Sequence, residues 1–348
     1  MSTGEVIIRT EGAIGRISLN RPKAIHALTH GMCLEMSTAL AGWAKDPAVG
    51  AVLLDHAEGR GFCSGGDIAL IRHSVLHDGG QSARRFFFDE YRLNHQMFTW
   101  SKPIVAFMDG ITMGGGVGIS QPARLRVSTE NTRFAMPETG IGLLPDVGGG
   151  WYLSRLPHRL GQYLGLTGAR LDGAECLRAG LATHYLPAAH LAEAAERLVG
   201  GEEPDAVLAA LSVQPPEPAI AAHVAEIERH FASDRLEDIL ASLESDPGEF
   251  AAKTLATLRT KSPQACKITL RQLAISPRLP DFAANMAMEY RAVGRAVVRP
   301  DFAEGVRAVI VDKDNNPRWT PARPEDVTDD SVEAFFAPLP ANEEWRPA

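Results

Sequence analysis

Residues 110–151 read GITMGGGVGISQPARLRVSTENTRFAMPETGIGLLPDVGGGW, with a glycine-dense turn at each end and a carboxylate, Glu138, between them. Three consecutive glycines, 114–116, can adopt unusual backbone conformations and bring their N–H groups against a ligand without a Cβ in the way. Backbone amides gathered at the start of a helix can hold negative charge. This stretch therefore predicts an oxyanion hole, the group of N–H donors that stabilises a negatively charged oxygen during acyl transfer.

A second turn of the same kind lies upstream, in GFCSGGDIALI (61–71), where Asp67 is placed to cap or charge the start of a helix. A short apolar run, AVLLDH (51–56), precedes it and reads as a buried strand. The same order of strand, glycine turn and helix recurs around KPIVAFMDG (102–110). Repetition of this unit predicts a parallel α/β sheet, with Asp146 projecting from a Gly- and Pro-rich loop at 143–150.

The remaining chain divides into an N-terminal α/β part and a helical C-terminal part. EVIIRT and GRISLN alternate as two strands, and the pattern becomes helical from about Trp151. Residues 201–218 are rich in Pro and acids and are interpreted as a connection. Ile220, Val224, Ile227 and Phe231 then repeat at the spacing of one helix face, and the last thirty or so residues are interpreted as a loose acidic tail. We expect a core at 1–200 and a helical region at 201–348.

Composition limits the classes of function. A chain of 348 residues with 45% hydrophobic and 22% charged residues is typical of a soluble globular protein. A net charge of −8 without a basic run argues against nucleic acid as a partner. Four scattered cysteines without CxxC spacing predict a reduced protein without a zinc site. No apolar run is long enough for a membrane span, and Glu5 and Glu11 stand where a mitochondrial transit peptide avoids acids, so a cytoplasmic location is expected.

Five segments form an ordered set that covers both ends and the middle of the chain. They are FCSGGDI (62–68), DGITMGGGVGIS (109–120), FAMPETGIGLLPDVGGGWYL (134–153), SPQACKITLRQL (262–273), and MEYR (288–291) followed by DFAEGVRAVIVDKDNNPRW (301–319). Together they resemble the enoyl-CoA hydratase/isomerase (crotonase) superfamily, and within it the 3-hydroxyisobutyryl-CoA hydrolase branch is most similar. The ordered set is highly specific, and the resemblance implies an α/β crotonase-like spiral of ββα repeats with a helical C-terminal region.

The resemblance also implies roles for site residues. Each glycine turn would give one N–H to a thioester carbonyl, and the matching donors are Gly66 and Gly115. Hydratases of the superfamily place a glutamate two residues beyond the glycine triplet, where this chain has Gly118. Glu138 matches their second glutamate, and Asp146 stands where they tend to have a small residue. This pattern is that of the hydrolase branch. Glu138 would attack the carbonyl or activate water, and Asp146 would orient the substrate or water, or protonate the leaving thiolate.

Residues expected to contact the substrate or its coenzyme A part lie around these turns. Lys23 matches the stretch that meets the nucleotide end of CoA, and a lysine can bind phosphate as a point charge. His26 and Ala69 depart from the family pattern, and Arg72 is a candidate substitute for an arginine at position 69. Cys63 is not expected to act as a nucleophile, because no histidine is placed to activate it. The other expected contacts are Ser64, Gly65, Asp67, Gly114 and Thr139.

The expected activity is hydrolysis of a short-chain 3-hydroxyacyl-CoA, with 3-hydroxyisobutyryl-CoA of valine breakdown as the first candidate substrate. No metal or redox cofactor is expected, since CoA is part of the substrate. Two alternatives stay open. One is an enoyl-CoA hydratase or isomerase, which one glutamate at position 138 could still support, and the other is a non-catalytic acyl-CoA-binding protein. The superfamily often forms oligomers, so a homo-oligomer is a further expectation that the sequence leaves open.

Overall fold

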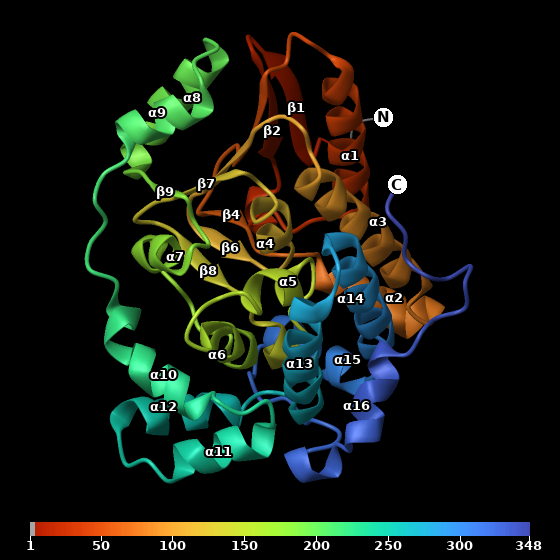
Figure 1. Cartoon of the computed structure of the whole chain (residues 1–348). Helices are drawn as coiled ribbons and strands as arrows, with labels where there is room; N and C mark the ends of the chain where they lie inside the picture. Colours follow the sequence, from red (N-terminus) through yellow and green to blue (C-terminus); the bar gives the residue numbers. More distant parts are fainter. Residues whose placement is uncertain (1–3) are drawn as a thin grey trace.

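The computed structural model describes residues 4–348, which fold around two sheets (Figure 1). The larger sheet has the strand order β1-β2-β3-β5-β7-β9, with β1 and β2 antiparallel and the other neighbouring pairs parallel. The smaller sheet has three parallel strands in the order β4-β6-β8. The larger sheet consists of β1 (Val6–Glu11), β2 (Ile14–Leu19), β3 (Ala51–His56), β5 (Ile104–Met108), β7 (Leu125–Ser128) and β9 (His184–Tyr185), and the smaller of β4 (Gly61–Cys63), β6 (Ile111–Met113) and β8 (Arg133–Ala135).

The predicted ββα repeat is confirmed in the order of the elements. Each of β3, β5 and β7 in the larger sheet is followed by one strand of the smaller sheet and then by a helix. The helix is α2 (Ile68–Asp78) in the first repeat, α4 (Gly115–Ser120) in the second and the 3-10 turn η2 (Glu138–Ile141) in the third. Parallel neighbours in the smaller sheet bring the three strand ends to one edge, which places both glycine turns and Glu138 together.

The central strands β3 and β5 of the larger sheet are buried on both faces, as expected for parallel strands with mostly apolar side chains. Leu53 and Val105 share one apolar cluster with α8 (Leu191–Val199) and α9 (Pro204–Leu211). Leu54 and Ala106, the next residues along these strands, face the opposite cluster, which includes side chains of α1 (His30–Lys45) and α3 (Gln81–Phe98). The period of two along each strand therefore decides which helices cover which face.

Helices form most of the chain after residue 148, and α14 packs against both α3 and α5 (Figure 1). No helix within residues 4–348 combines the length and the apolar character needed to cross a membrane. The helices are α5 (Gly149–Leu153), α6 (Leu160–Thr167), α7 (Gly173–Ala179), α10 (Val224–His230), α11 (Leu236–Glu244), α12 (Glu249–Leu258), α13 (Pro263–Ile275), α14 (Phe282–Ala296), α15 (Pro300–Val306) and α16 (Asp329–Phe336).

Two expectations about the C-terminal part are wrong. The segment interpreted as a connection contains α9, which begins at Pro204, a residue that fits the first helical position because its missing N–H is not needed there. The tail is not loose, because Phe335 of α16 is buried and Trp345 is 3% exposed. The Nε1–H of Trp345 donates a hydrogen bond to the Phe88 carbonyl at 3.1 Å. The acidic residues of the tail suggested a loose segment, but a few buried aromatic side chains hold it against the rest of the protein.

Candidate active site

The two glycine turns meet at the edge of the smaller sheet. Gly66 follows β4, and Gly115 begins α4 after β6. A Cβ built on Gly115 would lie 3.1 Å from the Gly66 nitrogen, and one on Gly65 would lie 3.6 Å from the Gly115 nitrogen. Gly65 has φ +115° and Gly114 has φ +50°, conformations that L side chains disfavour. The sequence-predicted pair of backbone donors is therefore adjacent in space.

Both amides are available for a ligand. Among residues 4–348, no loop, turn or cap hydrogen bond starts at the N–H of Gly66 or of Gly115. Their neighbours, in contrast, are tied down, since Leu28 N–H donates to the Gly65 carbonyl at 2.7 Å and Asp67 N–H donates to the Leu28 carbonyl at 2.9 Å. Two rigidly held donors without internal acceptors are what an oxyanion hole requires.

The two predicted carboxylates are both buried beside these turns. Glu138 begins η2 and Asp146 lies in the loop before α5, and each is 5% exposed. Glu138 Oε1 lies 3.1 Å from the position of a Cβ on Gly114, while its Oε2 has no hydrogen-bond partner within the described chain. Asp146 Oδ2 accepts a hydrogen bond of 2.6 Å from the Tyr91 hydroxyl. Of the two predicted carboxylates, Glu138 is therefore the one that lies against the second glycine turn, at Gly114.

Burial and mutual repulsion disfavour ionisation of these groups. Burial raises the pKa of Glu138 well above its ordinary value, and the charge of Asp146 raises it further. Burial raises the pKa of Asp146 to about 6, although the Tyr91 hydrogen bond opposes the shift. Carboxyl groups with raised pKa values can exchange protons near neutral pH, which is the property required of a general base or acid.

A third buried carboxylate, Glu90, was missed from the sequence. It is 1% exposed on α3, and its Oε1 has no partner among the residues that the structure describes. A Cβ on Gly115 would lie only 2.8 Å from this oxygen, so Glu90 borders the predicted oxyanion hole. The signal was present, because Glu90 shares the buried face of α3 with Phe86, Phe87 and Tyr91. An acid on an apolar helix face indicates a site when it meets other carboxylates.

The position of the hydratase glutamate is closed in this chain. A Cβ on Gly118 would lie 2.5 Å from Val147 Cβ and 3.2 Å from Asn94 Nδ2. Val147 follows Asp146 directly and has φ +53°. Any side chain at position 118 would therefore displace the loop that carries Asp146, so α4 cannot supply a second carboxylate here.

Gly118→Ala is accordingly expected to lower the free energy of unfolding by about 1–3 kcal/mol, the usual cost of forcing a methyl group into a packed core. Urea unfolding followed by circular dichroism measures this difference. Gly42→Ala is the matched control, because Gly42 lies in α1 with nothing within 4 Å of its added Cβ. Equal unfolding midpoints for the two variants would contradict the steric account.

The stretch around Lys23 that is expected to contact CoA lies beside the upstream glycine turn at 61–71. Lys23 is exposed in the short turn η1 (Pro22–Ala24). Ser64 joins this turn to the oxyanion loop, since its hydroxyl donates to the Ala24 carbonyl at 3.0 Å and its N–H donates to the Ile25 carbonyl at 2.9 Å. His26 is buried within the same stretch, where its Nε2 is 2.8 Å from the Glu58 carbonyl. The structure thus connects Ser64 to the main chain next to Lys23 and gives His26 a local structural contact.

Several polar groups that were expected near a ligand already interact with other groups of the protein. The Thr139 hydroxyl donates to the Leu166 carbonyl at 2.9 Å, so it has no proton left to offer a ligand. Asp67 caps α2 and accepts from Arg21 Nη2 at 3.0 Å. Burial raises the pKa of the Cys63 thiol to about 12, which suppresses the nucleophilic thiolate. Arg72 donates to the Ala303 carbonyl at 3.0 Å, so it connects α2 to α15.

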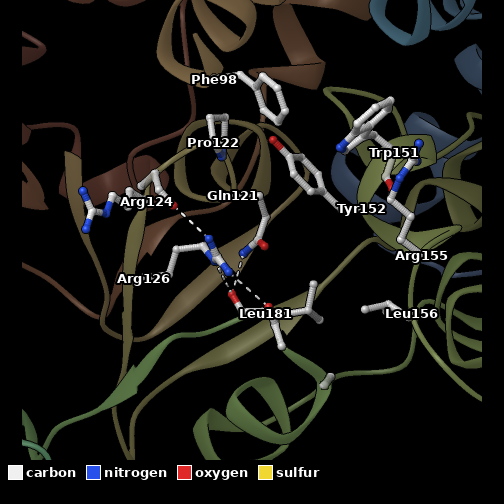
Figure 2. Close-up of a pocket in the computed structure, with 13 residues that line it drawn as sticks. Phe98, Gln121, Pro122, Arg124, Arg126, Trp151, Tyr152, Arg155, Leu156 and Leu181 are labelled. Atoms are coloured by element: carbon white, nitrogen blue, oxygen red, sulfur yellow. Dashed lines mark hydrogen bonds between the residues drawn. The ribbon is translucent and has the colours of Figure 1, made fainter. Parts of the chain in front are cut away.

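A separate hollow of about 460 Å³ lies beyond α5, and none of the predicted site residues lines it (Figure 2). Its wall includes Trp151 and Tyr152, and the Arg155 guanidinium stacks 3.4 Å from the centre of the Trp151 ring. Arg126, on the opposite wall, donates to the carbonyls of Ala123, Gly180 and Leu181. This hollow is therefore distinct from the carboxylate site, because neither Glu138 nor Asp146 lines it.

Comparison with known proteins identifies relatives over nearly the whole chain. The enoyl-CoA hydratase/isomerase family model matches residues 14–336. The mitochondrial 3-hydroxyisobutyryl-CoA hydrolase of Xenopus tropicalis is 41% identical over 97% of this chain and 89% of its own length. 3-Hydroxyisobutyryl-CoA hydrolase 1 of Arabidopsis thaliana is 38% identical over 96% of this chain and 92% of its own length.

Solved structures agree on the fold. A structure described as a carnitinyl-CoA dehydratase from Mycobacterium thermoresistibile has a TM-score of 0.94 and 41% identity, with 98% of both chains covered. A structure described as an enoyl-CoA hydratase from Rhodobacter sphaeroides 2.4.1 has a TM-score of 0.92 and 39% identity, covering 98% of this chain and 99% of its own. These scores confirm the expected crotonase-like spiral.

The expected cytoplasmic location is contradicted by these comparisons. The relatives from Xenopus tropicalis, Gallus gallus and Rattus norvegicus are all named as mitochondrial proteins, which points to mitochondria instead. The sequence argument failed because Glu11 belongs to β1 and Glu5 pairs with Arg21 at 3.0 Å. Their charges are part of the folded domain and carry no information about targeting.

The spiral of ββα repeats, the paired glycine turns and the match over residues 14–336 lead to one assignment. The chain belongs to the enoyl-CoA hydratase/isomerase family.

Proposed function

We propose that this protein hydrolyses 3-hydroxyisobutyryl-CoA to 3-hydroxyisobutyrate and CoA, a step of valine breakdown. The observation that carries the proposal is the juxtaposition of two free backbone amides with the buried carboxylates of Glu138 and Asp146. Relatives named for this hydrolase activity, about 40% identical over almost the whole chain, support the choice of substrate. The proposed reaction needs water and protein groups only.

The thioester carbonyl oxygen would lie between the N–H groups of Gly66 and Gly115. Attack on the carbonyl carbon places negative charge on this oxygen, and two fixed donors stabilise that charge more in the transition state than in the substrate. Glu138 then either attacks to form an anhydride or takes a proton from the attacking water. The C–S bond breaks, the thiolate takes up a proton, and water supplies the second oxygen of the released acid.

Asp146 and Glu90 complete the polar surroundings in this proposal. Tyr91 holds Asp146 through a hydrogen bond of 2.6 Å, so Asp146 is fixed to orient water or the substrate hydroxyl. Burial raises the pKa of Glu90 well above its ordinary value, and the nearby charge of Asp146 raises it further. A protonated Glu90 can donate a hydrogen bond, and its unpartnered oxygen can also accept one. The 3-hydroxyl of the substrate supplies both a donor and an acceptor.

Asp146→Asn is expected to move the acid limb of the kcat/KM profile to lower pH and to reduce the plateau at least about 10-fold. Removal of the Asp146 charge favours the ionised form of Glu138, so the pKa of Glu138 falls. In the unmodified protein, activity is expected to decline with falling pH because Glu138 becomes protonated, and protonation of Asp146 at about pH 6 adds to the loss. Thiol-release rates between pH 5 and 9 measure both effects. An acid limb that stays in place or moves upward would refute the coupling.

The alternative function is hydration or isomerisation of an enoyl-CoA. The descriptions of the two solved structures, a dehydratase and a hydratase, favour it. The glycine at position 118 argues against this alternative, because hydratases have a glutamate there. Glu90 and Asp146 nevertheless supply two other buried carboxylates in addition to Glu138. The deciding experiment compares thiol release from 3-hydroxyisobutyryl-CoA with absorbance loss of crotonyl-CoA on one preparation. Thiol release alone supports the hydrolase, hydration alone supports the alternative, and ligand binding without either would indicate a non-catalytic acyl-CoA-binding protein.

A further inference from the structure

A buried carboxylate from the C-terminal helices accepts hydrogen bonds from the loop that follows Asp146. Glu289 of α14 is fully buried, although it lies more than one hundred and forty residues away in sequence from Gly148. Its Oε2 accepts the Gly148 N–H at 2.7 Å, and its Oε1 accepts the Gly150 N–H at 2.8 Å. The two carboxylate oxygens therefore each hold one amide of the same short turn.

The same network also holds the chain on the other side of Asp146. Gln272 of α13 donates through Nε2 to the Pro145 carbonyl at 2.6 Å and to Glu289 Oε1 at 3.1 Å. Asn285 Nδ2 donates to Glu289 Oε1 at 2.8 Å. The main chain immediately before and after Asp146 is thus tied to two helices of the C-terminal region.

The tied segment needs such support because its backbone is strained. Val147, between Asp146 and Gly148, has φ +53°, which is unfavourable for a β-branched residue. The four N–H donors around Glu289 offset part of the cost of burying it, and burial raises its pKa to about 7. A packed apolar side chain at position 289 could fill the same space, but it could not hold two amides.

We propose that Glu289 is a positioning residue for the reaction. By holding the Gly148 and Gly150 amides, it keeps Val147 in its strained conformation and directs the Asp146 carboxylate toward Tyr91 and Glu138. This inference rests on the proposed function and deepens it, because it makes the C-terminal helical region part of the site. Loss of the two hydrogen bonds from Glu289 lets Asp146 leave its position, and this displacement affects the chemical step more than substrate binding.

Glu289→Gln tests the inference. An amide has one acceptor oxygen, so it can hold only one of the two N–H groups and turns its own N–H toward the other. We expect kcat for thiol release from 3-hydroxyisobutyryl-CoA to fall about 10- to 100-fold while KM changes less than about 3-fold. Hydrogen exchange at the Gly148 and Gly150 amides, read by mass spectrometry on peptides covering the loop, is expected to accelerate.

Glu344→Gln is the matched control, because Glu344 is a carboxylate of the C-terminal segment that contacts the same helix, α14, at another point. Glu344 accepts from Arg291 Nε of α14 at 2.9 Å and from the Leu339 N–H at 2.8 Å, away from the loop. This variant is expected to keep kcat within about 2-fold and loop exchange unchanged. A folded Glu289→Gln protein with unaltered kcat would overturn the inference, and so would a loss of kcat without faster loop exchange.

Two further measurements keep the outcomes separate. If Glu289→Gln does not fold, Gln272→Ala takes its place, since it removes the Pro145 tether, and an unaltered kcat in that variant would overturn the inference. If the unmodified protein releases no thiol from 3-hydroxyisobutyryl-CoA, the proposed function fails on that result alone. The exchange comparison between Glu289→Gln and Glu344→Gln still decides whether Glu289 fixes the loop.

Discussion

Glu138→Gln is expected to lower kcat for thioester hydrolysis by about 10²- to 10⁴-fold, the range attributed to a positioned acid or base. The glutamine has nearly the same size, so packing around η2 is retained, but it can neither attack the carbonyl nor accept a proton from water. Glu138 Oε2 has no hydrogen-bond partner among residues 4–348, so the substitution breaks no internal contact at that atom. The variant is therefore expected to bind CoA normally.

Two measurements check this expectation on one preparation. Thiol-release kinetics give kcat, and calorimetric titration with CoA gives the dissociation constant, which is expected to change less than about 3-fold. Glu196→Gln is the control, because Glu196 is an exposed residue of α8 on the far side of the larger sheet. Turnover by Glu138→Gln at the rate of this control would remove Glu138 from the mechanism.

The sequence predicted the parts of the site that are encoded locally. A buried strand, a glycine turn and a capped helix lie within about twenty residues, so local periodicity and the conformational range of glycine were sufficient to identify them. The strand at 51–56 agrees with β3, and Asp146 lies in a loop as expected. Gly66 and Gly115 could be paired because neighbouring parallel strands end at the same edge of a sheet.

The parts that were missed depend on contacts between distant segments. Glu90 and Glu289 each lie in a helix whose pattern predicts packing but not a partner, and their partners belong to other elements. The internal partner of Thr139 could not be predicted for the same reason, because its hydroxyl donates to the Leu166 carbonyl of α6. Single-chain periodicity identifies which face of a helix is buried, but it does not identify what that face meets.

The division between a catalytic core and a helical C-terminal region is therefore a division of sequence pattern and not of chemistry. Asp146 belongs to the first part, whereas Gln272 and Glu289, which hold its loop, belong to the second. Ser262, at the start of α13, adds a third connection, because its N–H donates to the Thr139 carbonyl at 3.0 Å, one residue after Glu138. Both predicted catalytic carboxylates thus depend on α13 and α14 for their placement.

Gly115→Ala is expected to lower kcat/KM for thiol release by about 10²- to 10³-fold, an effect as large as that of making one oxyanion donor unusable. The added methyl group would lie 3.1 Å from the Gly66 nitrogen and 2.8 Å from Glu90 Oε1, so it would occupy the space between the donors and the carboxylates. Gly115 is the first residue of α4 and its φ is outside the left-handed region, so alanine can adopt the backbone conformation. The loss therefore arises from blocked access to the two amides rather than from backbone strain.

Gly42→Ala serves again as the control, since its methyl group meets nothing within 4 Å. It is expected to leave kcat/KM unchanged and to stabilise the protein by about 0.5–1 kcal/mol, because Gly42 is an exposed position inside helix α1. Circular dichroism establishes that Gly115→Ala is folded before its kinetics are compared. A folded Gly115→Ala protein with kcat/KM within about 3-fold of the control would place the thioester carbonyl elsewhere. The carboxylates would then need another source of stabilisation for the developing oxyanion, because an uncompensated negative charge beside Glu90, Glu138 and Asp146 would be strongly disfavoured.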